Sequence, residues 1–241
     1  MWVKSYFTVI FSAKFTEDFP NDQVEIPMKL QFEQIFDISV RLGEESITFP
    51  GDPAFEREVL MNIPESGICE LSGLRMSAHS GTHIDMPSHF IEKGKRLGDY
   101  APAEFIFSAT VVEIDSPEAI FAADVHAASP EPGTALLFKT ANSLTGSCCN
   151  GKYTKDYVYL SADAANACVE KKVALVGIDY ITIEDPDDPD FPAHHAVLGN
   201  GIFILEGVNL RDAPAGKYTL IALPLNIPDG EASPVRAILL R

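Results

Sequence analysis

Five of the six histidines lie in two short segments of the 241-residue chain. Residues 79–89 read His-Ser-Gly-Thr-His-Ile-Asp-Met-Pro-Ser-His, and the second segment is the pair His194-His195. A glutamate, Glu206, follows a dozen residues later within an aliphatic run. Imidazole and carboxylate groups together are the usual ligands of hydrolytic metal centres. The clustering therefore points to metal-dependent chemistry.

The spacing within residues 79–89 favours an extended chain over a helix. Gly81 and Pro87 both oppose a helix, and Pro87 also argues against a central strand. Four polar residues share sequence parity, so an extended segment would present them all on one side: His79, His83, Asp85 and His89. We expect an extended or irregular segment that lines a cleft.

Glu206 has aliphatic neighbours on both sides within residues 202–210. Burying a carboxylate there without a partner would be costly. We therefore expect Glu206 to be protonated, to pair with a cation such as Arg211, or to bind a metal ion.

The candidate ligand set contains imidazoles and carboxylates and no thiolate: His79, His83, Asp85, one of His194 and His195, and Glu206. Such a set suits zinc, manganese or a similar divalent ion better than copper(I) or an iron–sulfur cluster. Because two carboxylates could bridge, the set also suits two ions separated by ~3.5–4 Å.

The composition excludes several classes of partner. Eighteen Lys and Arg residues against 35 Asp and Glu residues give a formal net charge of −17. Nucleic acids and anionic membranes both require clustered cations, so we expect neither as a partner. A small-molecule substrate is compatible with this charge. Four cysteines without a CxxC spacing suggest reduced thiols and a cytoplasmic protein.

The remaining pattern indicates one α/β domain over residues 34–241, preceded by an extension over residues 1–33. Short apolar runs of strand length occupy residues 110–114, 135–138, 173–178, 202–205 and 220–223. Serine caps predict helices over residues 116–123 and 161–172. An acidic loop over residues 184–190 leads to His194, and Asp179 could line a pocket or cap an element.

Residues 79–89 match HxGTHxDxPxH, a motif of the metal-dependent cyclase family, which includes bacterial-type kynurenine formamidases and isatin hydrolases. The turn Phe49-Pro-Gly-Asp52, the segments at Asp179, His194 and Glu206, and the closing residues 233–237 also resemble family positions. The resemblance covers the chain from about Phe36 to its end. It implies a swivelling β/β/α barrel-like single domain with a mixed sheet, assembled as dimers or tetramers.

The resemblance also implies roles for individual residues. His79, His83 and Asp85 would bind metal, with Asp85 bridging two ions, while His194 would hold the second ion and Glu206 would bridge. His89 would donate and accept protons. Phe49 would contact the substrate's ring, where kynurenine formamidases usually have a larger Trp.

The implied activity is hydrolysis of a small aryl formamide, above all N-formyl-L-kynurenine to kynurenine and formate, a step of tryptophan catabolism. One alternative is an isatin hydrolase-like opening of a cyclic amide, or hydrolysis of another small amide or ester. A second alternative is a non-catalytic metal-binding module.

Overall fold

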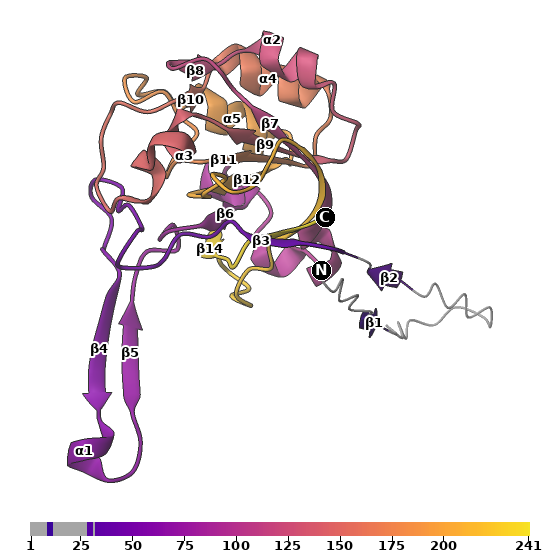
Figure 1. Ribbon diagram of the computed structural model, residues 1–241. Coiled ribbons are helices and arrows are strands. Elements are labelled where there is room, and N and C mark those ends of the chain that lie inside the picture. The colour runs from indigo at the N-terminus through magenta and orange to yellow at the C-terminus, as the bar shows by residue number, and fades with distance from the viewer. Residues whose placement is uncertain (1–8, 12–27, 31) are drawn as a thin grey trace.

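A strongly curled sheet of nine strands organises the protein (Figure 1). The computed structural model describes residues 9–11, 28–30 and 32–241. From one edge to the other the sheet contains β14 (Ala232–Pro234), β6 (His83–Asp85), β12 (Phe203–Glu206), β11 (Leu175–Ile178), β9 (Ala135–Lys139), β7 (Ile106–Glu113), β13 (Gly216–Ile221), β15 (Ile238–Leu240) and β3 (Ile35–Asp37).

The sheet is mixed. The four central strands β12, β11, β9 and β7 are parallel, whereas the strands on both flanks pair antiparallel. Of these, β9, β11 and β12 are buried on both faces, as their continuous apolar composition predicts, whereas β7 alternates between buried and more exposed residues. This α/β architecture with a mixed, barrel-like sheet agrees with the fold expected from the sequence.

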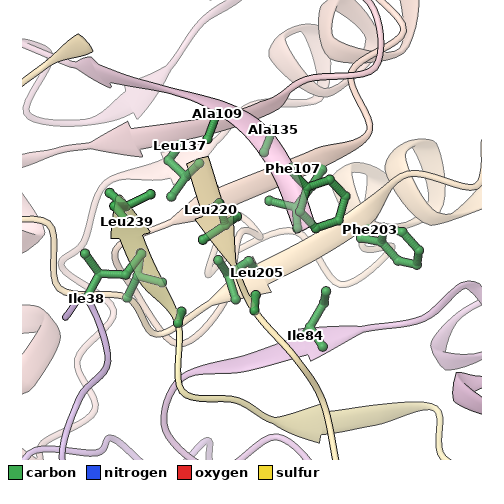
Figure 2. Close-up of a cluster of buried hydrophobic side chains, with 14 of the residues drawn as sticks. Ile38, Ile84, Phe107, Ala109, Ala135, Leu137, Phe203, Leu205, Leu220 and Leu239 are labelled. Atoms are coloured by element: carbon green, nitrogen blue, oxygen red, sulfur yellow. The ribbon is translucent and has the colours of Figure 1, made fainter. Parts of the chain in front are cut away.

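Side-chain alternation along the strands separates two apolar cores. In β12, Phe203 and Leu205 point into the concave interior of the sheet, where they meet Leu137, Leu220 and Leu239 (Figure 2). The alternate residue of β12, Ile204, belongs to the core on the opposite face. Period-two alternation therefore assigns each side chain of β12 to one of two layers.

Helices cover this second face of the sheet (Figure 1). They are α2 (Ala122–Ala128), α4 (Ala162–Glu170) and α5 (Pro192–Gly199). The predicted helix over residues 161–172 is confirmed as α4, because the hydroxyl of Ser161 accepts a hydrogen bond from the Ala164 amide at 3.3 Å. Shorter helical elements of the described residues are α1 (Ile63–Ser66), α3 (Ala141–Thr145), η1 (Pro87–His89), η2 (Leu97–Asp99), η3 (Pro102–Phe105) and η4 (Ser147–Cys149).

The helix predicted over residues 116–123 is wrong. Ser116 closes only a turn, in which its hydroxyl accepts from the Glu118 and Ala119 amides. The next residues form β8 (Ala119–Ile120), which pairs in parallel with β10 (Tyr159–Leu160), and α2 begins after it. Burial of the pair in β8 outweighs the local helix signal.

The expectation that residues 79–89 contain no central strand is also wrong. His83-Ile-Asp85 forms β6, which lies between β14 and β12. The strand ends before Pro87, which begins η1, so no ladder hydrogen bond is lost to the proline.

Two further strand pairs also lie outside the nine-strand sheet. A hairpin of β4 (Glu56–Met61) and β5 (Leu71–Arg75), with α1 at its tip, projects from the body; we call residues 56–75 the arm (Figure 1). β1 (Val9–Phe11) and β2 (Met28–Leu30) pair with each other. The assignment of residues 1–33 as an extension to a domain over 34–241 stays a prediction.

Candidate metal centre

The pairing of β6 with β12 brings three polar side chains together on the helix-covered face. Ile84 points into the concave core, so its neighbours His83 and Asp85 point to the opposite face. The register pairs Glu206 with His83 and Ile204 with Asp85. Since Ile204 packs in the helix-side core, the side chains of His83, Asp85 and Glu206 share that face.

These three side chains are buried and face one another. His83 Nε2 lies 3.1 Å from Glu206 Oε2 and 3.5 Å from Asp85 Oδ1. The other ring nitrogen of His83, Nδ1, lies 2.9 Å from the carbonyl oxygen of Gly81. A carbonyl can only accept a hydrogen bond, so Nδ1 carries a proton. Nε2 faces the two carboxylates, which favour a second proton there, and a metal ion that displaces this proton gains the Nε2 lone pair.

A glycine at the end of β12 permits this close pairing. Gly207 adopts φ +66°, and a Cβ built there would lie 2.4 Å from the carbonyl oxygen of Gly81. Any other residue would push the 79–83 segment away from β12. Thr82 fixes the same junction, because its hydroxyl donates to the Gly207 carbonyl at 2.6 Å.

Helix α5 supplies a further imidazole. His194 lies in its first turn on the buried side of the helix, and its Nε2 lies 3.4 Å from Glu206 Oε1. The same carboxylate oxygen accepts a hydrogen bond from the Ile183 amide at 2.7 Å. The other ring nitrogen, Nδ1, lies 2.7 Å from Glu184 Oε2. His195, one residue on, is exposed and outside this cluster.

His79 and His89 complete the cluster from the loop and the turn on either side of β6. His79 Nδ1 lies 3.0 Å from Asp85 Oδ1, and its Nε2 lies 3.7 Å from Glu231 Oε1. The ring of His89 packs 4.2 Å from that of His79 and 6.1 Å from that of His194, centroid to centroid. All six predicted ligand or proton-transfer residues thus lie in one cluster: His79, His83, Asp85, His89, His194 and Glu206.

The cluster fits a divalent metal. Ligand atoms of His79, His83 and Asp85 lie within 4.8 Å of one another, as do those of Asp85, His89 and His194. Asp85 belongs to both groups. Among the described residues, buried polar side-chain atoms without a hydrogen-bond partner are His83 Nε2, both Asp85 oxygens and Ser88 Oγ. Such atoms are costly unless a cation binds them, and three of the four face this centre.

The carboxylates dominate the electrostatics of the centre. Burial lowers the pKa of His83, but Asp85 and Glu206 outweigh it and raise that pKa to about 9. Burial likewise opposes protonation of His194, yet Glu184 and Glu206 raise its pKa to about 10. Burial lowers the pKa of His89, with His79 and His194 adding to the effect and Asp85 opposing it.

A pocket of about 330 Å³ lies beside the centre and shares Glu184 with it. Four aromatic side chains line it: Phe49, Tyr153, Tyr157 and Phe191. The rings of Phe49 and Tyr153 meet edge to face, with centroids 5.6 Å apart. Carboxylates of the 184–190 loop and Lys155 form the polar part of the lining. Phe49, the residue predicted to contact substrate, is therefore part of a pocket next to the imidazoles.

The structure also answers questions that the sequence left open. Glu206 faces His83 and His194, whereas the guanidinium of Arg211 donates to the Ser143 carbonyl at 3.1 Å. Asp179 does not line the pocket but accepts hydrogen bonds at the start of α3, from the amides of Thr140 and Ser143.

Sequence reasoning missed several residues beside the centre. Glu184 and Glu231 touch His194 and His79, and Phe90 stacks on His194 with centroids 4.5 Å apart. Glu184 begins an acidic, proline-rich run, so it reads as part of a solvated loop. Only its position directly after the mostly apolar Tyr180–Ile183 stretch signals burial.

No helix among the described residues combines the length and the apolarity needed to cross a membrane.

The chain is similar to several known proteins. Kynurenine formamidase of Bacillus cereus is 35% identical over 206 residues, which cover 84% of this chain and 95% of that protein. The solved structure of a predicted metal-dependent hydrolase from Bacillus stearothermophilus is 26% identical, with a TM-score of 0.73 over 86% of this chain and 97% of its own. An isatin hydrolase bound to the product analogue thioisatinate shares the fold at 21% identity, with a TM-score of 0.75 over 86% and 92% of the two chains.

The model of the Cyclase family, described as "Putative cyclase", matches residues 36–185. This range contains Phe49, the whole HxGTHxDxPxH motif and Glu184. Together with the identity to the formamidase, the match shows that the chain belongs to the Cyclase family.

Proposed function

We propose that this protein is a metal-dependent amidohydrolase that converts N-formyl-L-kynurenine to kynurenine and formate. One observation carries the proposal: Asp85 lies in both candidate metal-binding groups, one with His79 and His83 and the other with His89 and His194. Both groups lie beside an aromatic pocket. The identity to kynurenine formamidases over most of the chain supports the same reaction.

The donor set supports two divalent ions, zinc or manganese. His79, His83 and Asp85 would hold one ion, His194 the second, and Asp85 and Glu206 would bridge. When bound, such ions lower the pKa of a water molecule and polarise a carbonyl. Asp85 and Glu206 place their charges where the cations are needed.

His89 is the group assigned to proton transfer. Its lowered pKa leaves the imidazole neutral at pH 7, the form that accepts a proton from water. It can then pass this proton to the nitrogen of the leaving arylamine, which needs an acid to depart. The contact with His79 keeps the ring beside the ligands.

The pocket supports an aryl amide that carries charged groups. Its aromatic walls suit a phenyl ring, with Phe49 at the family's aromatic position. The carboxylates of Asp185 and Asp188 favour an ammonium group. Lys155 lines the same pocket, where it pairs with Asp187 at 2.7 Å, and it is the cation that would meet a substrate carboxylate. N-formylkynurenine carries all three features, whereas isatin is neutral.

The test is metal analysis of the purified protein together with a parallel assay of N-formylkynurenine and isatin. We expect two divalent ions per chain and preferential release of formate from N-formylkynurenine. Phe49→Ala should raise the KM for N-formylkynurenine by ~10-fold through lost stacking. If isatin were the preferred substrate, the formamidase assignment would be replaced by an isatin hydrolase-like one. This alternative is considered because an isatin hydrolase has the same fold. Bound metal without hydrolysis of any amide would indicate a binding module.

Two broader assignments belong to the same proposal. We place the enzyme in the cytoplasm, where its four unbridged cysteines would stay reduced. We also propose a homo-oligomer, a dimer or tetramer, supported by the exposed apolar side chains of the arm.

A further inference from the structure

Glu184 differs from the rest of the acidic loop in its surroundings. Glu184 is only 3% exposed, whereas Asp190 at the end of the loop is exposed. Among the described residues, no Lys or Arg forms an ion pair with Glu184. An isolated buried carboxylate would be costly, so its position needs an explanation from its contacts.

Three nitrogens of one helix start surround the Glu184 carboxylate. Oε1 accepts a hydrogen bond from the Ala193 amide at 3.1 Å, and Oε2 accepts from the His194 amide at 3.0 Å. Oε2 also lies 2.7 Å from His194 Nδ1. The N-cap residue of α5, Phe191, provides no side-chain cap, so Glu184 fills that role from a distant loop.

The backbone of Glu184 is held equally firmly. Its amide donates to the Thr182 hydroxyl at 3.2 Å, and its carbonyl accepts from the Tyr157 hydroxyl at 2.8 Å. Tyr157 in turn stacks on Tyr180 with centroids 4.1 Å apart. The carboxylate therefore has a fixed position relative to the imidazole of His194.

We propose that Glu184 is a positioning residue that keeps the proton of His194 on Nδ1 and turns Nε2 toward the metal centre. A carboxylate accepts only, so the ring nitrogen beside it carries the proton. A metal ion binds only the neutral ring, and in that form Nε2 holds the lone pair, on the side where Glu206 lies 3.4 Å away. This inference rests on the proposed metal centre.

The arrangement parallels that of His83, with a different acceptor. The Gly81 carbonyl fixes the proton of His83 on Nδ1, and Glu184 does the same for His194. A charged acceptor makes an imidazole a stronger donor to metal than a neutral one does. Glu184 also lines the pocket, so it links the wall of the pocket to one ligand of the centre.

The variant Glu184→Gln separates positioning from simple capping. Gln keeps the shape of the side chain but has one acceptor oxygen and no charge. With that oxygen at the Oε2 position, a neutral acceptor replaces the charged one at His194 Nδ1; with it at the Oε1 position, an amide donor faces Nδ1 and favours a ring proton on Nε2. Both orientations weaken His194 as a metal ligand. We expect zinc affinity, measured by competition with a chromogenic chelator, to fall ~10–100-fold. Asp190→Asn, which removes the same charge from the same loop, should leave the affinity unchanged.

A second measurement does not depend on the folding of any variant. A long-range ¹H–¹⁵N spectrum of the zinc-loaded wild-type protein should show the proton of His194 on Nδ1. A proton on Nε2, or an affinity of Glu184→Gln within twofold of wild type, would overturn the inference. Because both readouts concern metal binding, they stand apart from the formamide assay, which tests the proposed function.

Discussion

At the scale of single residues, His89 is the imidazole whose surroundings differ from those of the ligand candidates. His83 and His194 are buried and each has a carboxylate oxygen within 3.5 Å of Nε2, whereas His89 contacts other rings and is partly exposed. Carboxylates raise the pKa of the first two, and burial lowers that of His89. The imidazoles assigned to metal binding, His83 and His194, therefore have raised pKa values, and the one assigned to proton transfer, His89, has a lowered pKa.

This division predicts different losses in two variants. His89→Ala should keep its metal and lose ~10²–10⁴-fold in kcat, because only the proton-transfer group is removed. Asp85→Ala should lose metal, since it removes the carboxylate common to both ligand groups. Metal content by mass spectrometry and kcat on N-formylkynurenine measure the two effects. His126→Ala, at an exposed histidine, is the control. Full turnover by His89→Ala would contradict the assignment.

The raised pKa values of two imidazoles predict that metal binding depends on pH. In the metal-free protein, pKa values of about 9 for His83 and about 10 for His194 mean that both rings are protonated at pH 7. A metal ion binds only the neutral ring, so it must displace these protons. Apparent affinity should therefore rise from pH 6 to pH 9, by up to ~10-fold per pH unit for each proton released.

Calorimetric titration with zinc in buffers of different ionisation enthalpy counts the protons released. We expect close to two at pH 7. An affinity that stays constant between pH 6 and pH 8 would show that the imidazoles are already neutral before the metal arrives.

The sequence predicts the candidate metal ligands better than the residues that orient them. His79, His83, Asp85 and His89 are found because they lie within eleven residues and share one motif. Glu184 is not found, because its role depends on a contact with α5 across a folded loop. The candidate ligands can be identified from their spacing in the sequence, whereas the contacts that orient them form only in the tertiary structure.

At the scale of elements, register and capping explain what the sequence could and could not predict. The apolar runs locate β9, β11 and β12, since strands buried on both faces need continuous apolar sequence. They do not reveal β6, a three-residue strand that exists because both of its neighbours pair with it. The helix predicted at 116–123 fails for the same reason, because β8 pairs with a distant strand.

Asp179 is the cap on which α3 depends. It follows β11 directly, and it accepts from the Thr140 amide at 2.8 Å, the Thr140 hydroxyl at 2.7 Å and the Ser143 amide at 3.0 Å. These donors are buried, so removing the carboxylate leaves them unsatisfied.

Asp179→Ala should therefore lower the free energy of unfolding by about 3 kcal/mol. Denaturant unfolding followed by circular dichroism measures the change, with Asp115→Ala at an exposed carboxylate as the control. An unchanged midpoint for Asp179→Ala would mean that α3 is capped by other groups.

At the scale of the whole molecule, the two faces of the curled sheet have different roles. The concave face holds an apolar core (Figure 2), and the helix-covered face holds a second core together with the polar cluster. Composition and strand length predict an α/β sheet, but the direction of its curl follows from packing that no single segment encodes. The sequence does not predict the arm either, because its strands are mostly exposed and show no alternation of buried and exposed residues.

The arm supplies the last prediction, which concerns assembly. A two-stranded hairpin alone is marginally stable, yet Val59, Leu60, Ile68, Leu71 and Leu74 are all exposed on it. Burial of these side chains against another copy would stabilise both the arm and the assembly. We therefore expect light scattering to give a multiple of the chain mass. Leu60→Glu combined with Leu74→Glu should shift it to one chain, while Leu144→Glu, at an exposed leucine of α3, should not. A wild-type mass of one chain would exclude the oligomer, and an oligomer that survives the double variant would place the interface elsewhere.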